Sequence, residues 1–267
     1  MKVITKISVQ QNHKERYNIF LNGTFAFSVD EAVLAQFRLK KGMEIGENEI
    51  SEILYADEVR KGYQASIYYL GKRMRTEKEI RKFLQKKEYS DDVIDIVVQK
   101  LYKEQYLDDQ DFAKAYVRTQ IKTTDKGPIV IEEELAQKGV DRDKIVQALE
   151  IYGWEEQVNK AKKLTQKVFQ RNPKESFLQK KQKAIQLLRR KGFSGDVINE
   201  AFADAIKKDE EKEKEALFYQ AEKAFRRYRS TSENERLRKV QQFLYRKGFS
   251  MEDIQQAVEW FKEEHDF

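Results

Sequence analysis

The sequence has 267 residues, of which 40% are hydrophobic and 37% are charged, a composition that supplies a thin core under a large solvated surface. It contains no cysteine, which excludes disulfides, thiolate catalysis and cysteine-based zinc sites. Lys and Arg number 52 against 46 Asp and Glu, and this excess is concentrated in segments 60–90 and 158–193. The segment 158–193 has twelve basic residues and one acid, so we expect surface patches of positive charge.

The first thirty residues are typical of β-structure. Apolar and polar residues alternate over 3–9, 17–21 and 25–29, and Asn22-Gly23 separates the second and third of these runs. Asn-Gly is a strong hairpin signal because both residues tolerate positive φ. We therefore predict a three-stranded antiparallel sheet at the N-terminus.

Two short helices are predicted to follow the sheet. Asp30 is suited to cap a helix that ends near Phe37, and a second short helix is predicted over about 47–54. The N-terminus lacks the apolar core of a secretory signal, and no uncharged apolar run approaches the length of a membrane span. We expect a cytoplasmic protein without membrane contact.

From about residue 56 onward the sequence contains an internal repeat. Four segments align without gaps on Lys87, Lys138, Lys191 and Lys247. In each segment, apolar residues stand three positions before the lysine and two, seven and eleven positions after it. A glycine follows the lysine in all but the first segment, where Glu88 takes its place. Because glycine there ends a helix in the left-handed conformation, each segment predicts a helix, a tight turn and a second helix.

An apolar stripe with helical spacing precedes each of these pairs, so the repeating unit is predicted to have three helices. Thr76 with Glu79, and Ser232 with Glu235, form capping boxes that predict where two of the middle helices begin. We expect a mainly α fold: four tandem three-helix repeats forming an elongated curved array, preceded by a small N-terminal antiparallel β-sheet. The predicted domains are 1–55 for the sheet with its short helices, and 56–104, 105–153, 154–208 and 209–267 for the four repeats.

The arrangement resembles the RecX family. The stretch RMRTEKEIRKFLQKK (73–87) is similar to its early repeat, and YLDDQDFAKAYVRTQ (106–120) and EELAQKG (133–139) follow in the family's order. The segment ERYNIFLNGTFAFSVDEAVLAQFRLKKGMEI (15–45) is similar to the extension of the longer Gram-positive members. The resemblance covers essentially the whole chain, with the fourth repeat exceeding the three of shorter members.

The resemblance implies a function. RecX proteins are regulators of the RecA recombinase, so this chain is expected to be a negative regulator that binds the RecA–single-stranded DNA filament. It would lie in the filament groove across several protomers and alter ATPase activity, strand exchange and filament assembly during recombinational DNA repair and the SOS response. Tethered repeats suit this role because many weak contacts then act together.

Positive charge recurs at the same end of each predicted repeat, and this is the basis of the candidate binding residues. A repeat array could align these turns into a stripe that follows a phosphate backbone or an acidic protein groove. Cations near helix C-termini also complement the helix dipole, and for the recurrence the two interpretations have equal weight. The candidates are Lys72, Arg73, Arg75, Lys122, Lys126, Lys167, Arg171, Arg189, Arg190, Arg226, Arg227 and Arg229.

The residues that would support other chemistry do not form a recognisable site. The two histidines, His13 and His265, are too far apart to form a local metal or triad motif. Gly71-Lys72 lacks the earlier glycine and the following Ser or Thr of a phosphate loop. Asp108 and its neighbours Asp109 and Asp111 are interpreted as helix caps rather than a cation site. We predict no catalytic residues, no metal, no cofactor and no enzymatic activity.

Two alternatives remain. The chain could be a tandem helix-turn-helix protein that binds single- or double-stranded DNA, because three helices with a glycine turn are similar to that motif. Acidic residues in the last helices of the repeats, such as Asp91 and Glu252, disfavour sequence-specific reading of a duplex but not weaker non-specific binding. The other alternative is a generic helical scaffold for an unrelated partner. We expect a monomer in each case.

Overall fold

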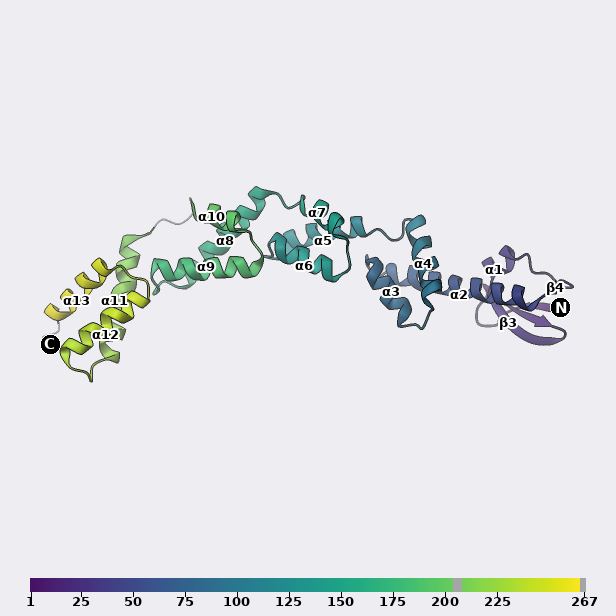
Figure 1. The fold of residues 1–267 in the computed structure, drawn as a ribbon, viewed down its shortest axis with the longest axis horizontal. Helices are drawn as coiled ribbons and strands as arrows, with labels where there is room; N and C mark the ends of the chain where they lie inside the picture. The colour runs from purple at the N-terminus through teal and green to yellow at the C-terminus, as the bar shows by residue number, and fades with distance from the viewer. Residues whose placement is uncertain (204–207, 265–267) are drawn as a thin grey trace. The chain divides into compact units, whose positions relative to one another are not determined.

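The computed structural model describes residues 1–203 and 208–264, so His265 lies outside the described residues. The chain divides into two compact units, and Figure 1 shows the ribbon of the chain with its helices and strands labelled. The first comprises Met1–Ala115 and Leu135–Ala148, and the second Tyr116–Glu134 and Leu149–Phe267. None of the helices in the described part of the chain is long and apolar enough to span a membrane.

The first unit begins with a four-stranded antiparallel sheet rather than the predicted three strands. Strands β1 (Lys2–Val9), β2 (Arg16–Leu21), β3 (Thr24–Asp30) and β4 (Glu44–Ile45) lie in the order β3-β2-β1-β4. The predicted hairpin turn is confirmed, with φ of 50° at Asn22 and 89° at Gly23. Strand β4 pairs with the start of β1, and two residues are too few to show an alternating pattern in the sequence.

A single long helix replaces the two helices predicted between residues 47 and 70. Asp30 caps α1 (Glu31–Gln36) as predicted, by accepting the backbone amide of Ala32 at 3.0 Å. Helix α2 (Glu47–Leu70) is then continuous for 24 residues, so the predicted boundary at residues 55 and 56 falls inside it. No proline interrupts this stretch, and its single glycine, Gly62, lies inside the helix. The other residues favour one continuous element.

The sheet is fastened to the middle of α2 by Asp57, which is 1% exposed. Its carboxylate accepts hydrogen bonds from the Arg16 guanidinium on β2 at 2.8 Å and from the Asp30 amide at 2.8 Å. Burial raises the pKa of Asp57, but the bonds from Arg16, Lys61 and the Asp30 amide outweigh it and hold that pKa below its usual value. The same helix thus belongs to the sheet domain and to the first repeat.

The predicted tandem three-helix repeats are confirmed. Leu84, Leu135, Leu188 and Leu244, which stand three residues before each repeat lysine, are completely buried. The remaining helices are α3 (Glu77–Gln85) and α4 (Asp91–Lys103); α5 (Asp109–Thr123), α6 (Pro128–Gln137) and α7 (Arg142–Leu149); α8 (Trp154–Arg171), α9 (Phe177–Lys191) and α10 (Gly195–Ala203); and α11 (Glu210–Arg227), α12 (Glu233–Arg246) and α13 (Met251–Glu264).

Two of the junctions between repeats use a side-chain hydroxyl. The Thr76 hydroxyl at the start of α3 donates to the carbonyl oxygen of Lys138, at the end of α6, at 2.8 Å. The Ser176 hydroxyl at the start of α9 donates in the same way to the carbonyl oxygen of Lys247, at the end of α12. Each bond joins the start of one middle helix to the end of the next middle helix. It satisfies a carbonyl that helix geometry leaves without a partner.

The middle junction uses the backbone instead. The amide of Gly127 donates to the carbonyl oxygen of Lys191 at 2.6 Å, and the amide of Ile129 donates to the carbonyl oxygen of Gly192 at 3.1 Å. Glycine at 127 permits this approach, because a Cβ there would lie 2.4 Å from the Gly192 oxygen. The three junctions therefore join equivalent positions of the repeats by different hydrogen-bond donors.

These junctions explain the glycine that follows the repeat lysine. Gly139, Gly192 and Gly248 have φ of 84–85°. A Cβ on Gly192 would lie 2.6 Å from the Val130 amide nitrogen, and the other two glycines also face the preceding repeat. Glu88 in the first repeat adopts the same left-handed region, with φ of 65°, and no middle helix precedes it in the chain. Close packing between repeats, as well as φ, thus selects glycine.

One predicted capping box is confirmed and the other is wrong. Thr76 and Glu79 form the complete box at the start of α3, whereas Ser232 makes no capping hydrogen bond at the start of α12. The hydroxyls of Thr76 and Ser176 are oriented by a carbonyl of the following repeat. The described residues provide no equivalent carbonyl at Ser232, which is exposed.

Replacing Gly192 by alanine tests the junction. We expect Gly192→Ala to lower the free energy of unfolding by about 2–5 kcal/mol, because the methyl group meets Val130 and the left-handed backbone is strained. Gly195→Ala is the control, since no atom lies within 4 Å of a Cβ at that position. Urea unfolding of both variants measures the difference. Equal stability of the two variants would contradict this role of the junction.

Candidate anion-binding cleft

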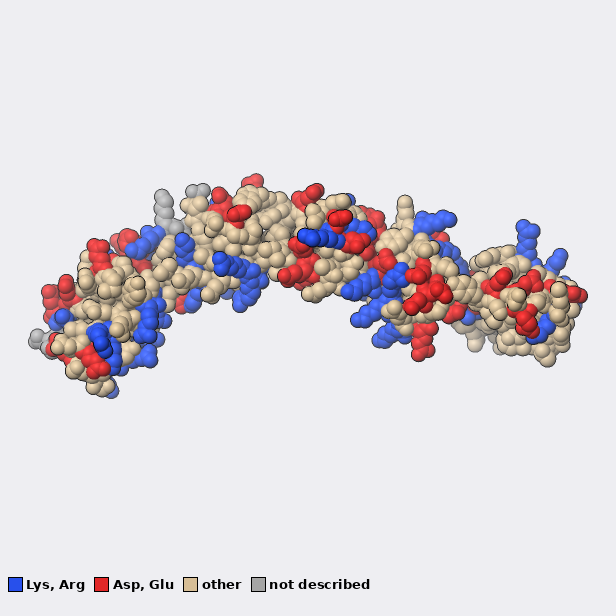
Figure 2. Space-filling model, viewed as in Figure 1, with Lys and Arg blue, Asp and Glu red and all other residues tan. Residues whose placement is uncertain are grey.

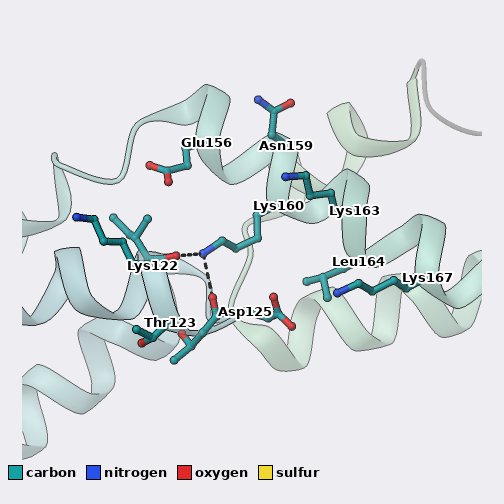
Figure 3. Close-up of a pocket in the computed structure, with 11 residues that line it drawn as sticks. Lys122, Thr123, Asp125, Glu156, Asn159, Lys160, Lys163, Leu164 and Lys167 are labelled. Atoms are coloured by element: carbon teal, nitrogen blue, oxygen red, sulfur yellow. Dashed lines mark hydrogen bonds between the residues drawn. The ribbon is translucent and has the colours of Figure 1, made fainter.

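The second unit contains a cleft of about 360 Å³ where the turn between α5 and α6 meets α8 (Figure 3). Lysines dominate its lining: Lys122 lies at the end of α5, and Lys160, Lys163 and Lys167 lie on α8. The remaining lining residues are Ile121, Thr123, Thr124, Asp125, Glu156, Asn159 and Leu164. The residue types therefore favour binding of an anion over catalysis.

Lys160 fixes the shape of the cleft. Its amine donates to the carbonyl oxygen of Ile121 and, at 2.9 Å, to that of Thr124, as Figure 3 shows. Burial lowers the pKa of Lys160, since the charged amine has lost part of its hydration. Both carbonyls lie at the end of α5, where orphan acceptors need a donor. Lys160 thus holds the α5–α6 turn against α8.

The position of Lys160 is occupied by acids in the neighbouring repeats. Counting 22 residues from the repeat lysine gives Asp109, Lys160 and Glu213. Asp109 accepts the backbone amide of Glu77 at 2.9 Å, and Glu213 accepts that of Phe177 at 2.7 Å. Each acid thereby caps the first residue of the middle helix in the preceding repeat.

Proline explains why the middle junction has a lysine instead. The first residue of α6 is Pro128, which has no amide proton to donate. An acid at position 160 would therefore have no such donor to accept from and would be left partly buried. A lysine at that position bonds the two carbonyls before the proline. The lysine of the third repeat therefore complements the proline of the second repeat at this contact.

Three lysines of the cleft remain able to bind a ligand. Lys122, Lys163 and Lys167 are exposed, and no ion pair is recorded for them in the described part of the chain. Asp125 and Glu156 also line the cleft and reduce its net positive charge. The hydroxyls of Thr123 and Thr124 donate to carbonyls of α5. The exposed amines can therefore hold a phosphate or carboxylate by charge.

The structure brings together only two of the twelve predicted binding residues, Lys122 and Lys167. Sequence reasoning missed Lys160 and Lys163, although the spacing 160, 163 and 167 places these lysines on one face of a helix. Among the other candidates, Arg171, Arg189, Arg190 and Arg229 are exposed but do not line this cleft.

The remaining candidates have partners nearby. Three of them form ion pairs: Arg73 with Glu79 at 2.8 Å, Lys126 with Glu134 at 2.5 Å, and Arg226 with Glu222 at 2.5 Å. The other three lie over aromatic rings: Lys72 over Tyr68, Arg75 over Tyr69, and Arg227 over Tyr228. These contacts are local to each repeat, which is the pattern expected when cations also stabilise their own helix ends.

Comparison with known proteins identifies the family. The model of the regulatory protein RecX N-terminal domain matches residues 2–46. Models of the RecX first and second three-helix domains match residues 63–101 and 108–149. The third three-helix domain matches twice, at 155–202 and 210–258. The chain belongs to the RecX family. The last two repeats therefore both match the same RecX module.

Curated and solved relatives agree with this assignment. The chain is 47% identical to the regulatory protein RecX of Geobacillus sp. (strain WCH70), covering 98% of each chain, and 48% identical to that of Bacillus subtilis (strain 168), covering 97% and 98%. A crystal structure of regulatory protein RecX is similar with a TM-score of 0.69 and 41% identity, covering 74% of this chain and 98% of that one. RecX from Lactobacillus salivarius matches with a TM-score of 0.55 and 36% identity, over 56% and 97% of the two chains.

The buried cap Glu213 predicts a pH dependence. Burial raises its pKa, so its ionised form is disfavoured in the folded state and its contribution to stability decreases as pH rises through that pKa. We expect Glu213→Gln, which keeps an acceptor for the Phe177 amide, to be at least as stable as the wild type near neutral pH. Glu213→Ala leaves that amide without an acceptor and should lose about 1–3 kcal/mol.

The measurement is urea unfolding of the three proteins from about pH 7 to about pH 5. The wild type should gain stability relative to Glu213→Gln as pH falls. If Glu213→Gln is destabilised near neutral pH as much as Glu213→Ala, the ionised carboxylate is required for the cap, which would contradict this prediction.

Proposed function

We propose that this RecX-family chain is a negative regulator of the RecA recombinase, which binds the RecA–single-stranded DNA filament during recombinational DNA repair and the SOS response. The proposal depends on one observation: RecX domain models match the sheet domain and all four repeats in order. In this proposal the protein acts by binding rather than by catalysis, as a cytoplasmic monomer without a cofactor. RecA and its DNA are the partners.

The cleft supports this function through its exposed amines. Three cationic amines are available to DNA phosphates or to the carboxylates of a recombinase protomer, those of Lys122, Lys163 and Lys167. Each such contact at a solvated surface is weak. Several repeats on one chain convert weak contacts into avidity, because binding of the first raises the effective concentration of the others. The filament would thereby be restrained in ATP turnover, strand exchange and growth.

Reversing two of these charges tests the function. Added at substoichiometric amounts to RecA on single-stranded DNA, the wild type should lower the ATPase rate and shorten the filaments. The double variant Lys122→Glu/Lys167→Glu should need about ten times more protein for the same effect, because the amines then become repulsive to anions.

Lys214→Glu/Lys223→Glu is the matched control, because both lysines are exposed on α11 of the same unit and outside the cleft. It changes the net charge equally and should retain most of the activity. A wild type that changes neither ATPase rate nor filament length would contradict the proposed function. Equal loss in both variants would contradict the role of the cleft.

A further inference from the structure

The first unit contains a second basic groove, which the predicted binding residues did not include. It has a volume of about 790 Å³ and lies where α3 meets the end of α6. Its principal lining residues are Lys78, Lys82, Lys86, Lys87, Tyr69 and Phe83. Figure 2 shows Lys and Arg gathered over the α3 region. We call this feature the α3 groove.

A row of lysines forms one side of the α3 groove. Lys78, Lys82 and Lys86 recur every fourth residue, so their side chains leave the same face of α3 about 6 Å apart. All three are exposed. Lys78 donates to the carbonyl oxygen of Gln137 at 3.0 Å, whereas no carboxylate partner is recorded for Lys82 or Lys86 in the described part of the chain. The row is therefore a linear array of available positive charge.

The acid in the lining does not neutralise this row. Glu79 accepts from the Arg73 guanidinium at 2.8 Å and from the Thr76 amide at 3.2 Å, and Lys138 lies 3.9 Å away. Burial raises the pKa of Glu79, but its bonds with Arg73 and Thr76 outweigh burial and lower it. Its charge is therefore committed to the start of α3 and to the repeat junction.

A column of stacked rings forms the other side of the groove. The rings of Tyr69 and Phe83 are stacked with centroids 4.1 Å apart and planes 7° from parallel. The guanidinium of Arg75 covers the Tyr69 ring at 3.9 Å, and the amine of Lys87 lies 5.5 Å from the Phe83 centroid. The Arg75 Nε atom is buried without a hydrogen-bond partner. The Lys87 side chain, which lies at the Phe83 end of the column, is exposed.

We infer that the α3 groove binds single-stranded nucleic acid, with phosphates on the lysine row and one base stacked on Phe83 in place of the Lys87 amine. Charged rows beside aromatic rings are the combination that binds unpaired strands, because phosphates take the cations and any base has a face to stack. A duplex keeps its base faces covered, and an acidic peptide would use the lysines alone. This inference rests on the proposed function, because the α3 groove would be the place where the chain contacts the DNA of the filament directly.

The experiment measures binding of a fluorescein-labelled oligothymidylate to the full chain by anisotropy, without recombinase, over a range of salt concentrations. Lys82→Ala/Lys86→Ala should weaken binding and reduce the slope of log affinity against log salt by about 1.4, since each phosphate contact on a single strand contributes about 0.7. Lys40→Ala/Lys41→Ala is the control, because both lysines are exposed in the same unit and outside the groove. It should leave the slope nearly unchanged.

The aromatic contact is tested separately. Phe83→Leu should weaken binding about 5- to 100-fold with the salt slope unchanged, because it removes a stacking surface and no charge. Phe83 also packs against the core of the first repeat, so Phe83→Tyr, which keeps the ring, should restore affinity. If Phe83→Tyr binds as weakly as Phe83→Leu, stacking is not the cause of the loss and the inference fails.

Competitors decide between ligand classes. Unlabelled oligothymidylate should displace the probe at lower concentration than duplex DNA or polyglutamate of equal charge. Equal displacement by polyglutamate, with Phe83→Leu binding normally, would show an acidic-peptide site and overturn the inference.

Failure of this inference is distinct from failure of the proposed function. A chain that slows RecA ATPase but binds no oligothymidylate overturns only the α3 groove, and the reverse result overturns only the regulation of RecA.

Discussion

The fold depends on the bond between the start of one middle helix and the end of the next. Thr76 and Ser176 donate side-chain hydroxyls, and Gly127 donates its amide, to the carbonyls of Lys138, Lys247 and Lys191. A three-helix unit buries only a small apolar core, so its stability depends on the interface with its neighbour. These bonds also position the surfaces that flank the junctions, including the α3 groove and the candidate anion-binding cleft.

The sequence predicted the features that arise from local periodicity. The leucine before each repeat lysine and the glycine after it located the helices and turns, because burial and left-handed φ restrict residue choice at single positions. Strand β4 and the continuity of α2 were missed. Two residues are too short for a pattern, and Asp57 stabilises the middle of α2 through a contact with Arg16, 41 residues away in the chain.

The candidate sites were predicted less well for a related reason. Basic residues were grouped by their place in a turn, and the structure shows that Arg73, Lys126 and Arg226 are paired with nearby acids. Lysines spaced along helices were overlooked, including Lys163 on α8 and Lys82 on α3. Whether a cation is free depends on which carboxylate lies beside it. The pair of Glu222 and Arg226 has i, i+4 spacing and was open to sequence reasoning, whereas the pairs of Arg73 and Lys126 with their acids depend on how the turn before the helix folds. The division of the chain into five domains stays a prediction.

The alternation of Asp109, Lys160 and Glu213 has a consequence for how such chains can be rearranged. At two junctions a carboxylate accepts a hydrogen bond from a backbone amide. At the third, the Lys160 amine donates to backbone carbonyls just before Pro128. Moving the third module directly behind the first would set the Lys160 amine against the Glu77 amide, two donors without an acceptor. The modules of this chain are therefore not freely interchangeable: a duplicated or transplanted module keeps its stability only when its new neighbour has the complementary partner.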